Sequence, residues 1–147
     1  MTTTPRFSLP LLAAAQAQKE VTHNEALTLI DALIHAAIEA GPQAEPPVEP
    51  GDGGCWLVGA GATDDWAGKE GMLAIRTAGG WRFVAPRTGM RVARLADGKW
   101  LRFDGSAWVE PMAITGPAGG STIDSEARSV IAALILLLGA HGLLISG

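Results

Sequence analysis

Hydrophobic positions in this chain follow a helical period at both ends and a two-residue period in the middle. Near the N-terminus, Leu27, Ile30 and Ile34 recur in steps of three and four, which places them on one face of a helix. No glycine interrupts residues 8–40. The pattern therefore predicts a helix over these residues, with an apolar stripe that packs against a partner.

The middle of the chain changes to short apolar runs with alternating polar positions. Three dipeptides between these runs favour tight turns: Gly79-Gly80, Asp97-Gly98 and Asp104-Gly105. Tryptophan follows shortly after several of these turns, a weak internal repeat. The pattern predicts a small antiparallel β-meander over residues 55–110.

Two segments rich in glycine and proline separate these parts of the chain. Residues 41–54 hold four prolines and no apolar period, which is typical of a stiff, extended linker. Residues 111–121 form a second Gly/Pro linker. We expect both segments to connect folded parts without forming elements of their own.

The C-terminal part has the pattern of a helix seam. Its apolar positions recur every seven residues, with a second set four residues further along: Ile123, Val130, Leu137 and Leu144, then Ala127, Leu134 and His141. Ser121 and Asp124 lie three residues apart and resemble a capping box. The pattern predicts a helix within residues 122–147.

A second apolar stripe makes this helix too hydrophobic for the surface of a monomer; it contains Ile131, Ile135, Leu138 and Ile145. Three or more bundled copies would bury both stripes, and we expect a trimer or a pentamer. The run from Val130 to Ile145 is shorter than the roughly 20 residues that a membrane span needs. We therefore favour burial by partner subunits over a membrane span.

Together these elements predict an α+β protein, with an N-terminal helix, a small antiparallel β-meander and an apolar C-terminal helix that forms an oligomeric bundle. The expected segments are an N-terminal helical attachment segment (1–40), a linker (41–54), a β-rich domain (55–110), a linker (111–121) and an oligomerisation or partner-docking helix (122–147).

Charge and cysteine content narrow the function. The chain has 15 acidic and 11 basic residues, and its arginines are spread along the middle, so no basic footprint for nucleic acid is present. Cys55 is the single cysteine, which excludes an intrachain disulfide and fits synthesis in a reducing cytoplasm. The apolar N-terminal stretch is too short for a signal peptide.

Candidate chemistry is sparse. Asp64 and Asp65 could be imagined as a carboxylate pair for glycoside cleavage, but adjacent aspartates before Trp66 favour a turn. Cys55 has no identifiable base. The three histidines lack metal-ligand spacing: His23, His35 and His141. We expect no catalytic residue, metal site or cofactor, and hence no enzyme.

Five tryptophans and no tyrosine occur in the chain. Most are expected to fill the core of a small sheet. Trp66 lies on a polar, glycine-rich stretch and is the best candidate for an exposed ring that could stack on a sugar.

The N-terminal run from Leu9 to Leu27, with the core AQAQKEVTHNEAL, resembles a family of phage and prophage proteins of alphaproteobacteria that includes head-spike proteins of gene transfer agents. Further matches extend the resemblance over most of residues 9–110: Asp52-Gly53, Trp66–Gly68, Gly80–Pro86, Gly89 and Phe103–Trp108. The resemblance implies a particle-surface component. Longer members carry distal domains that attach to polysaccharide, and this chain ends soon after the shared part.

The leading hypothesis is a structural protein of a phage-like particle, a head-spike or fibre base made in the bacterial cytoplasm. Its expected partners are copies of itself and capsid or other spike and fibre proteins, with no nucleic acid. The alternative is a carbohydrate-binding adhesin module for capsular or envelope polysaccharide. A third hypothesis, a depolymerase, would require catalysis by Asp64 or Asp65.

Overall fold

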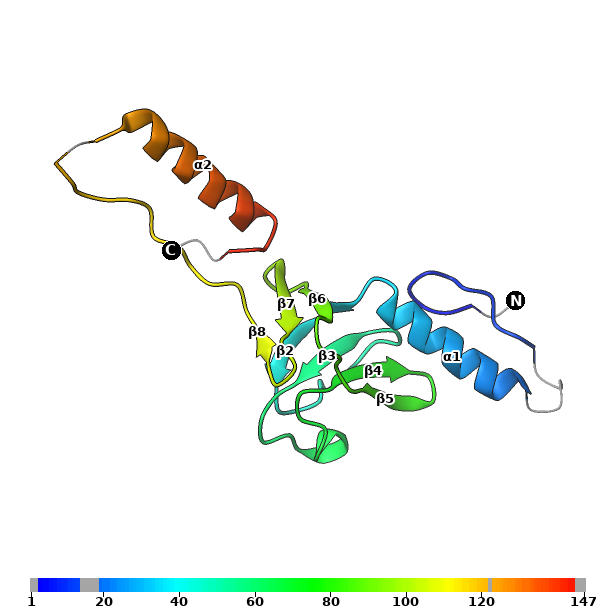
Figure 1. Ribbon diagram of the computed structural model, residues 1–147. Helices are drawn as coiled ribbons and strands as arrows, with labels where there is room; N and C mark the ends of the chain where they lie inside the picture. Colours follow the sequence, from blue (N-terminus) through cyan, green and yellow to red (C-terminus); the bar gives the residue numbers. More distant parts are fainter. Residues whose placement is uncertain (1–2, 14–18, 122, 145–147) are drawn as a thin grey trace.

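The computed structural model describes residues 3–13, 19–121 and 123–144. The described elements, in chain order, are α1 (Lys19–Leu33), β1 (Ala37–Ile38), β2 (Ala40–Gln43), β3 (Cys55–Val58), the 3₁₀ helix η1 (Asp64–Trp66), β4 (Leu73–Thr77), β5 (Gly80–Val84), β6 (Arg91–Arg94), β7 (Lys99–Phe103), β8 (Trp108–Val109) and α2 (Ser125–Ala140). Figure 1 shows a body of helix α1 and the strands, with α2 standing away from it.

The strands form two four-stranded sheets, in the orders β1-β6-β7-β8 and β2-β3-β4-β5. β1 and β2 are separated by Glu39 alone, so the chain passes directly from one sheet to the other. β1 pairs in parallel with β6, and β2 pairs in parallel with β3, while the remaining pairs are antiparallel. The α+β class is confirmed. Within residues 55–110 every strand pair joins consecutive strands and is antiparallel, as the predicted meander requires. These strands are divided between two sheets, however, and each sheet becomes mixed through β1 or β2, which precede residue 55.

The main core lies where α1 and both sheets meet. Its buried members come from six elements: Ala32, Ile38, Cys55, Leu57, Leu73, Ile75, Val92 and Leu101. A second cluster covers the other face of β3 and β4 with Trp56, Val58, Trp66 and Ala74. All four residues of β3 are buried because both of its faces are covered, which explains its uninterrupted apolar run.

The predicted helix over residues 8–40 is wrong at both ends. α1 begins at Lys19, because residues 3–12 instead form a loop held by side chains of α1. After Leu33 the chain leaves the helix and places Ala37 and Ile38 in β1, where they pair with β6. Residues 14–18, part of the specific motif, lie outside the described residues.

The predicted linker over residues 41–54 begins one strand too early. β2 ends at Gln43, and Gly41 in this strand has φ +125°. A Cβ atom on Gly41 would lie 2.5 Å from the carbonyl oxygen of Leu57, so glycine is required for β2 to approach β3. The remainder, from residue 44 to residue 54, contains no helix or strand.

At the C-terminal end, α2 is shorter than the expected segment 122–147. Its N-cap is Asp124, whose carboxylate accepts a hydrogen bond from the backbone N–H of Ala127 at 2.9 Å, so the cap predicted at Ser121 is wrong. Ile145, part of the predicted second stripe, lies outside the described residues. Neither described helix combines the length and apolarity needed to cross a membrane.

Candidate functional site

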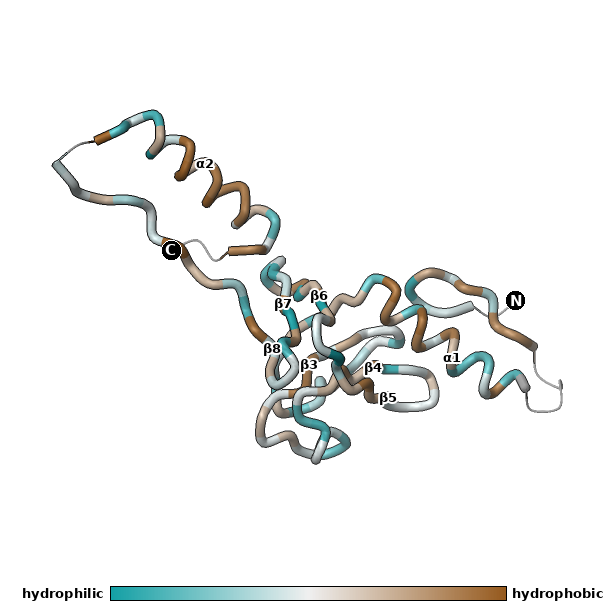
Figure 2. The backbone as a smooth tube through the Cα atoms, viewed as in Figure 1, coloured by the Kyte–Doolittle hydropathy of each residue, from teal (hydrophilic) through white to brown (hydrophobic). Residues whose placement is uncertain are grey.

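The most unusual surface of the molecule is α2, which has no buried residue. Large aliphatic side chains are exposed all along it, with Val130 60%, Leu136 71% and Leu137 54% exposed. Figure 2 shows apolar colouring along α2 after its polar first turn. Leaving so much apolar surface in water is costly, which makes α2 the candidate interaction surface.

Three of the residues that the sequence predicted as an oligomer interface lie on α2, and Ile123 directly precedes the N-cap of this helix. Ile123 is 63% exposed, and Leu134 is 51% exposed, alongside Val130 and Leu137. Leu144 differs, because it is half-buried and lines a cavity near Asp97 with the end of α2. The seam is thus available to a partner along the helix.

The segment that carries α2 leaves the body at a fixed point, which centres on Arg94. Arg94 is 8% exposed; its Nε and Nη2 donate to the Asp97 carboxylate at 2.9 and 2.7 Å, and its Nη1 donates to Glu110. These hydrogen bonds hold the pKa of Asp97 and that of Glu110 below their usual range. Glu110 immediately precedes the linker of residues 111–121 that leads to α2, so Arg94 fixes the start of this linker to the body.

The same segment returns to the body after α2. The backbone N–H of Trp100 donates to the carbonyl oxygen of Gly142 at 3.1 Å. Gly142 has φ +67°, and a Cβ atom there would collide with the carbonyl oxygen of Gly98. The segment that contains α2 is therefore attached to the body at both ends, through Glu110 before it and Gly142 after it.

The stripe expected on the N-terminal helix is also largely uncovered. Ile30 is 48% and Ile34 is 66% exposed, while Leu27 is half-buried. The neighbouring side chains of Leu29 and Leu33 are the ones that pack on the main core. The outer stripe of α1 remains available to a partner.

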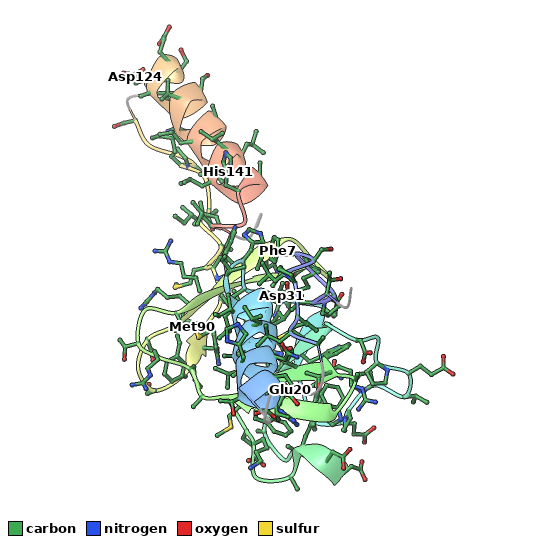
Figure 3. The ribbon with its side chains drawn as sticks, turned by 90° about the vertical axis from the view of Figure 1, so that its right-hand side faces the viewer. Phe7, Glu20, Asp31, Met90, Asp124 and His141 are labelled. Carbon is green, nitrogen blue, oxygen red and sulfur yellow. The ribbon has the colours of Figure 1, made fainter. Side chains whose placement is uncertain are left out.

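The N-terminal loop is fastened to α1 by Asp31, a residue that sequence reasoning did not select. Its buried carboxylate accepts hydrogen bonds from Thr4 Oγ1 at 2.6 Å, Arg6 N–H at 2.8 Å and Phe7 N–H at 2.7 Å. Asn24 makes two more bonds, with the backbone of Leu12. Asn24 therefore organises the loop from within the motif that carried the family resemblance. Figure 3 shows Phe7 of the loop beside Asp31 of α1.

The prediction that Trp66 is exposed is wrong. Trp66 is 0% exposed, and its ring packs edge-to-face on Trp81 with centroids 5.2 Å apart. η1 turns the indole inward onto the sheet, whereas the carboxylates of Asp64 and Asp65 remain exposed. Trp66 cannot offer a ring face to a sugar.

Other candidate groups take part in packing. Burial raises the pKa of the Cys55 thiol to about 12, so this thiol stays protonated at neutral pH. The His35 ring meets Trp100 edge-on at 6.4 Å, and His141 follows α2 as its C-cap. Among the described residues, no cluster of His, Cys, Asp or Glu is arranged to hold a metal ion.

A groove that the sequence reasoning missed lies on the outer face of β6, β7 and β8. Arg91 lies directly opposite Arg102 across β6 and β7, and Arg102 lies opposite Val109. Together with Trp100 and Leu143, these residues line a cavity of about 180 Å³. The alternation in RVAR and KWLRF could have indicated this face, because Val92 and Leu101 between them are buried.

Comparison with known families matches residues 23–109 to DUF2793, described as a protein of unknown function. The match begins inside α1 and ends at the last residue of β8, so it covers the body and excludes α2. No curated protein matches the chain.

Proposed function

The chain belongs to the DUF2793 family, a family of unknown function, and from this premise we propose that it is a structural protein of a phage-like particle. It serves as a head-spike or fibre base that assembles with copies of itself through α2. The resemblance of its N-terminal motif to gene transfer agent head-spike proteins suggests the particle.

The observation that carries this proposal is the exposure of α2. A helix with no buried residue and with Val130, Leu134 and Leu137 more than half exposed needs apolar partners in water. Its seam repeats every seven residues, so identical helices can interdigitate along their length. A second apolar stripe favours three or more copies over two.

The rest of the molecule suits an adaptor. Ile30 on α1 and Ile34 directly after this helix are available to a capsid or another spike protein, and α1 lies at the opposite side of the body from α2 (Figure 1). In this proposal, α1 faces the particle and α2 gathers the copies at the particle surface.

The direct test is the solution mass by light scattering, for the full chain and for a chain ending at Ser121. We expect a defined trimer or pentamer for the full chain and dissociation after truncation. A full chain that stays monomeric at every concentration would contradict the proposal.

A point variant tests the same surface without truncation. Leu134→Asp places a charge in the seam. We expect it to raise the protein concentration at which half of the assembly is dissociated by about tenfold or more, because the charge would have to be buried. Ser129→Asp is the matched control, because Ser129 is also exposed on α2. Equal behaviour of the two variants would show that the seam is not the contact.

The particle location needs a separate test. Antibodies to this chain should label purified phage-like particles at their surface projections in electron micrographs. If cells that make the protein release particles that carry no label, the proposed location on the particle is wrong.

Carbohydrate binding is a second candidate function, and a cavity beside Trp81 favours it. This cavity of about 390 Å³ is lined by Arg76, Trp81, Asp64, Asp65 and the prolines that precede β3. Arg76 stacks over the Trp81 ring at 5.7 Å, so donors, carboxylate acceptors and an indole meet there.

The test of this second function is binding of purified host capsular polysaccharide. Binding should be lost in Arg76→Gln and Asp65→Asn and kept in Asp52→Asn, which changes an exposed carboxylate that does not line the cavity. No binding by the unchanged protein would exclude this function.

A further inference from the structure

A groove and a loop of the same chain carry complementary charges, and each has an exposed apolar part. We propose that the loop of residues 44–50, AEPPVEP, docks into the groove on the outer face of β6, β7 and β8 of a second copy. The inference rests on the proposed function, because it assigns the contact between the bodies that α2 gathers.

The groove carries two arginines that can receive an acidic segment, because Glu110, the one acidic residue of its lining, is already bonded to Arg94. Arg91 and Arg102 are exposed and lie directly opposite each other, and like charges in this position repel. Within the described residues, neither forms a salt bridge. A carboxylate between the two guanidinium groups would relieve this repulsion and accept hydrogen bonds from both.

The floor of the groove is apolar. The Trp100 ring and the Val109 side chain share the face that carries the two arginines, because the strand register places them opposite Ala93 and Arg102. Leu143 forms one wall of the 180 Å³ cavity. Such a groove, with an apolar floor and arginines beside it, suits a short segment in which an apolar residue is flanked by acidic residues.

The loop supplies such a segment. Val48 is 97% exposed, the highest value for any large aliphatic residue among those described, and it projects between Pro47 and Glu49. Glu45 and Glu49 are both exposed and flank the apolar tip. Prolines restrict the backbone, so the loop loses little conformational entropy when it binds.

The base of this loop is held in place by the body. The backbone N–H of Thr63 donates to the Ala44 carbonyl oxygen at 3.1 Å, and the N–H of Gly59 donates to the Gln43 carbonyl oxygen at 2.7 Å. The loop is therefore presented in a defined position, which favours recognition by a rigid partner.

Charge complementarity favours a second copy as the occupant. Residues 39–65 hold six acidic residues and no Lys or Arg: Glu39, Glu45, Glu49, Asp52, Asp64 and Asp65. Residues 71–103 hold seven basic residues and one acidic residue, Asp97. Several of these basic residues are paired within their own copy, whereas Arg91 and Arg102 form no salt bridge among the described residues. Two copies placed head to tail can bring Glu45 and Glu49 of one copy to these two arginines of the next.

The loop and the groove lie on different sides of the body. In Figure 3, Met90, which directly precedes β6, lies on the side opposite the cyan stretch before β3. A contact between two different surfaces is heterologous, and it closes into a ring when the rotation between copies permits. This arrangement agrees with a trimer or a pentamer around α2 and differs from a two-fold dimer.

A zero-length cross-link in the full chain tests the contact. Arg102→Lys keeps the charge and introduces an amine that carbodiimide can join to a neighbouring carboxylate, forming an amide with loss of water. Nitrogen-15-labelled and unlabelled copies are refolded together before cross-linking. We expect peptides that join the introduced lysine to Glu45 or Glu49 and that carry one label each.

The control is Arg82→Lys, because Arg82 Nη2 lies 3.0 Å from Glu25 of the same copy. Its cross-linked peptides should join the two positions within one copy and show no mixing of labels. Failure of the position-102 variant to cross-link to the loop, or cross-links without mixed labels, would overturn the inference.

Charge exchange provides the second test. Glu45→Arg with Glu49→Arg should weaken assembly of the full chain about tenfold or more, and so should Arg91→Glu with Arg102→Glu. All four substitutions in one chain should restore assembly. Glu25→Arg with Glu70→Arg is the control, because both are exposed acidic residues outside residues 39–65.

The outcomes separate this inference from the proposed function. If Leu134→Asp dissociates the assembly while the charge variants do not, α2 acts alone and the loop contact is wrong. If no oligomer forms in any variant or in the unchanged chain, the proposed function itself is wrong.

Discussion

At the scale of single residues, two buried polar side chains organise parts of the chain that have no regular structure. Asp31 gathers three donors from the N-terminal loop, and Arg94 joins Asp97, Glu110 and the Gly41 carbonyl oxygen. Buried polar groups must keep their partners, because each unpaired one costs free energy. We therefore expect substitution of either residue to lower the free energy of unfolding more than substitution of an exposed residue of the same type.

Asp31→Ala should lower the free energy of unfolding by about 3 kcal/mol, because it leaves three donors of the N-terminal loop without their acceptor. Asp52→Ala removes an exposed carboxylate and should change it by less than about 0.5 kcal/mol. Urea unfolding of both variants measures the difference. Similar values for the two would show that Asp31 does not hold the loop.

The contacts of Arg94 determine part of the pH dependence of folding stability. It holds the pKa of Asp97 and that of Glu110 below their unfolded values, so these carboxylates stabilise the fold above about pH 4. This stability is lost as the pH falls through the lowered folded pKa values.

Arg94→Met should therefore reduce the loss of stability between about pH 5 and pH 2 relative to the unchanged chain. Urea midpoints across this pH range measure it. Arg82→Met is the control, because its partner Glu25 is half exposed and the pair contributes little. Parallel pH curves for the Arg94 variant and the unchanged chain would contradict the assignment.

At the scale of elements, α2 is stabilised by its own local features and makes few contacts with the body. Asp124 caps its first turn, Glu126 adds a negative charge there, and the chain turns at Gly142 after its end. Without tertiary burial, the cap is a larger share of helix stability than it would be in a packed helix.

Asp124→Ala should reduce the helical circular dichroism of dilute protein, because loss of an N-cap costs about 1 kcal/mol. Asp124→Asn should retain most of the signal, since asparagine caps equally well. The urea midpoint of the body should be the same in both variants. An unchanged helical signal in the alanine variant would show that tertiary contacts, and not the cap, maintain α2.

At the scale of the whole molecule, the body and α2 are joined by a connector whose residues 112–121 are exposed. The body has a two-sheet core, whereas α2 has none of its own. The family match ends where the body ends, at residue 109. The apolar helix α2 therefore lies outside the part of the chain that matches the family.

Limited digestion with subtilisin should first cut within residues 112–121, because exposed backbone without regular hydrogen bonds is the preferred site of proteolysis. Mass spectrometry should find a body fragment that ends there and resists further cleavage. First cuts within residues 55–110 would contradict this description of the body.

Local pattern was enough to predict much of the architecture. Helical character at both ends, short strands in the middle and the apolar nature of α2 all follow from the period of apolar residues and from nearby glycines. The exposed apolar positions Val130, Leu134 and Leu137 also follow from spacing alone, while their role as an oligomer seam stays a prediction. These properties depend on residues only a few positions apart, so the sequence by itself determined them.

The tertiary structure decided the rest. Residues 37–43 became two strands because β6 and β3, more than ten positions away, offered them hydrogen bonds. Trp66 was buried because η1 turned it onto Trp81, and Arg91 met Arg102 through the register of β6 and β7. Such pairings depend on how distant segments pack, and many distant partners are compatible with one local pattern, so spacing along the chain could not select them.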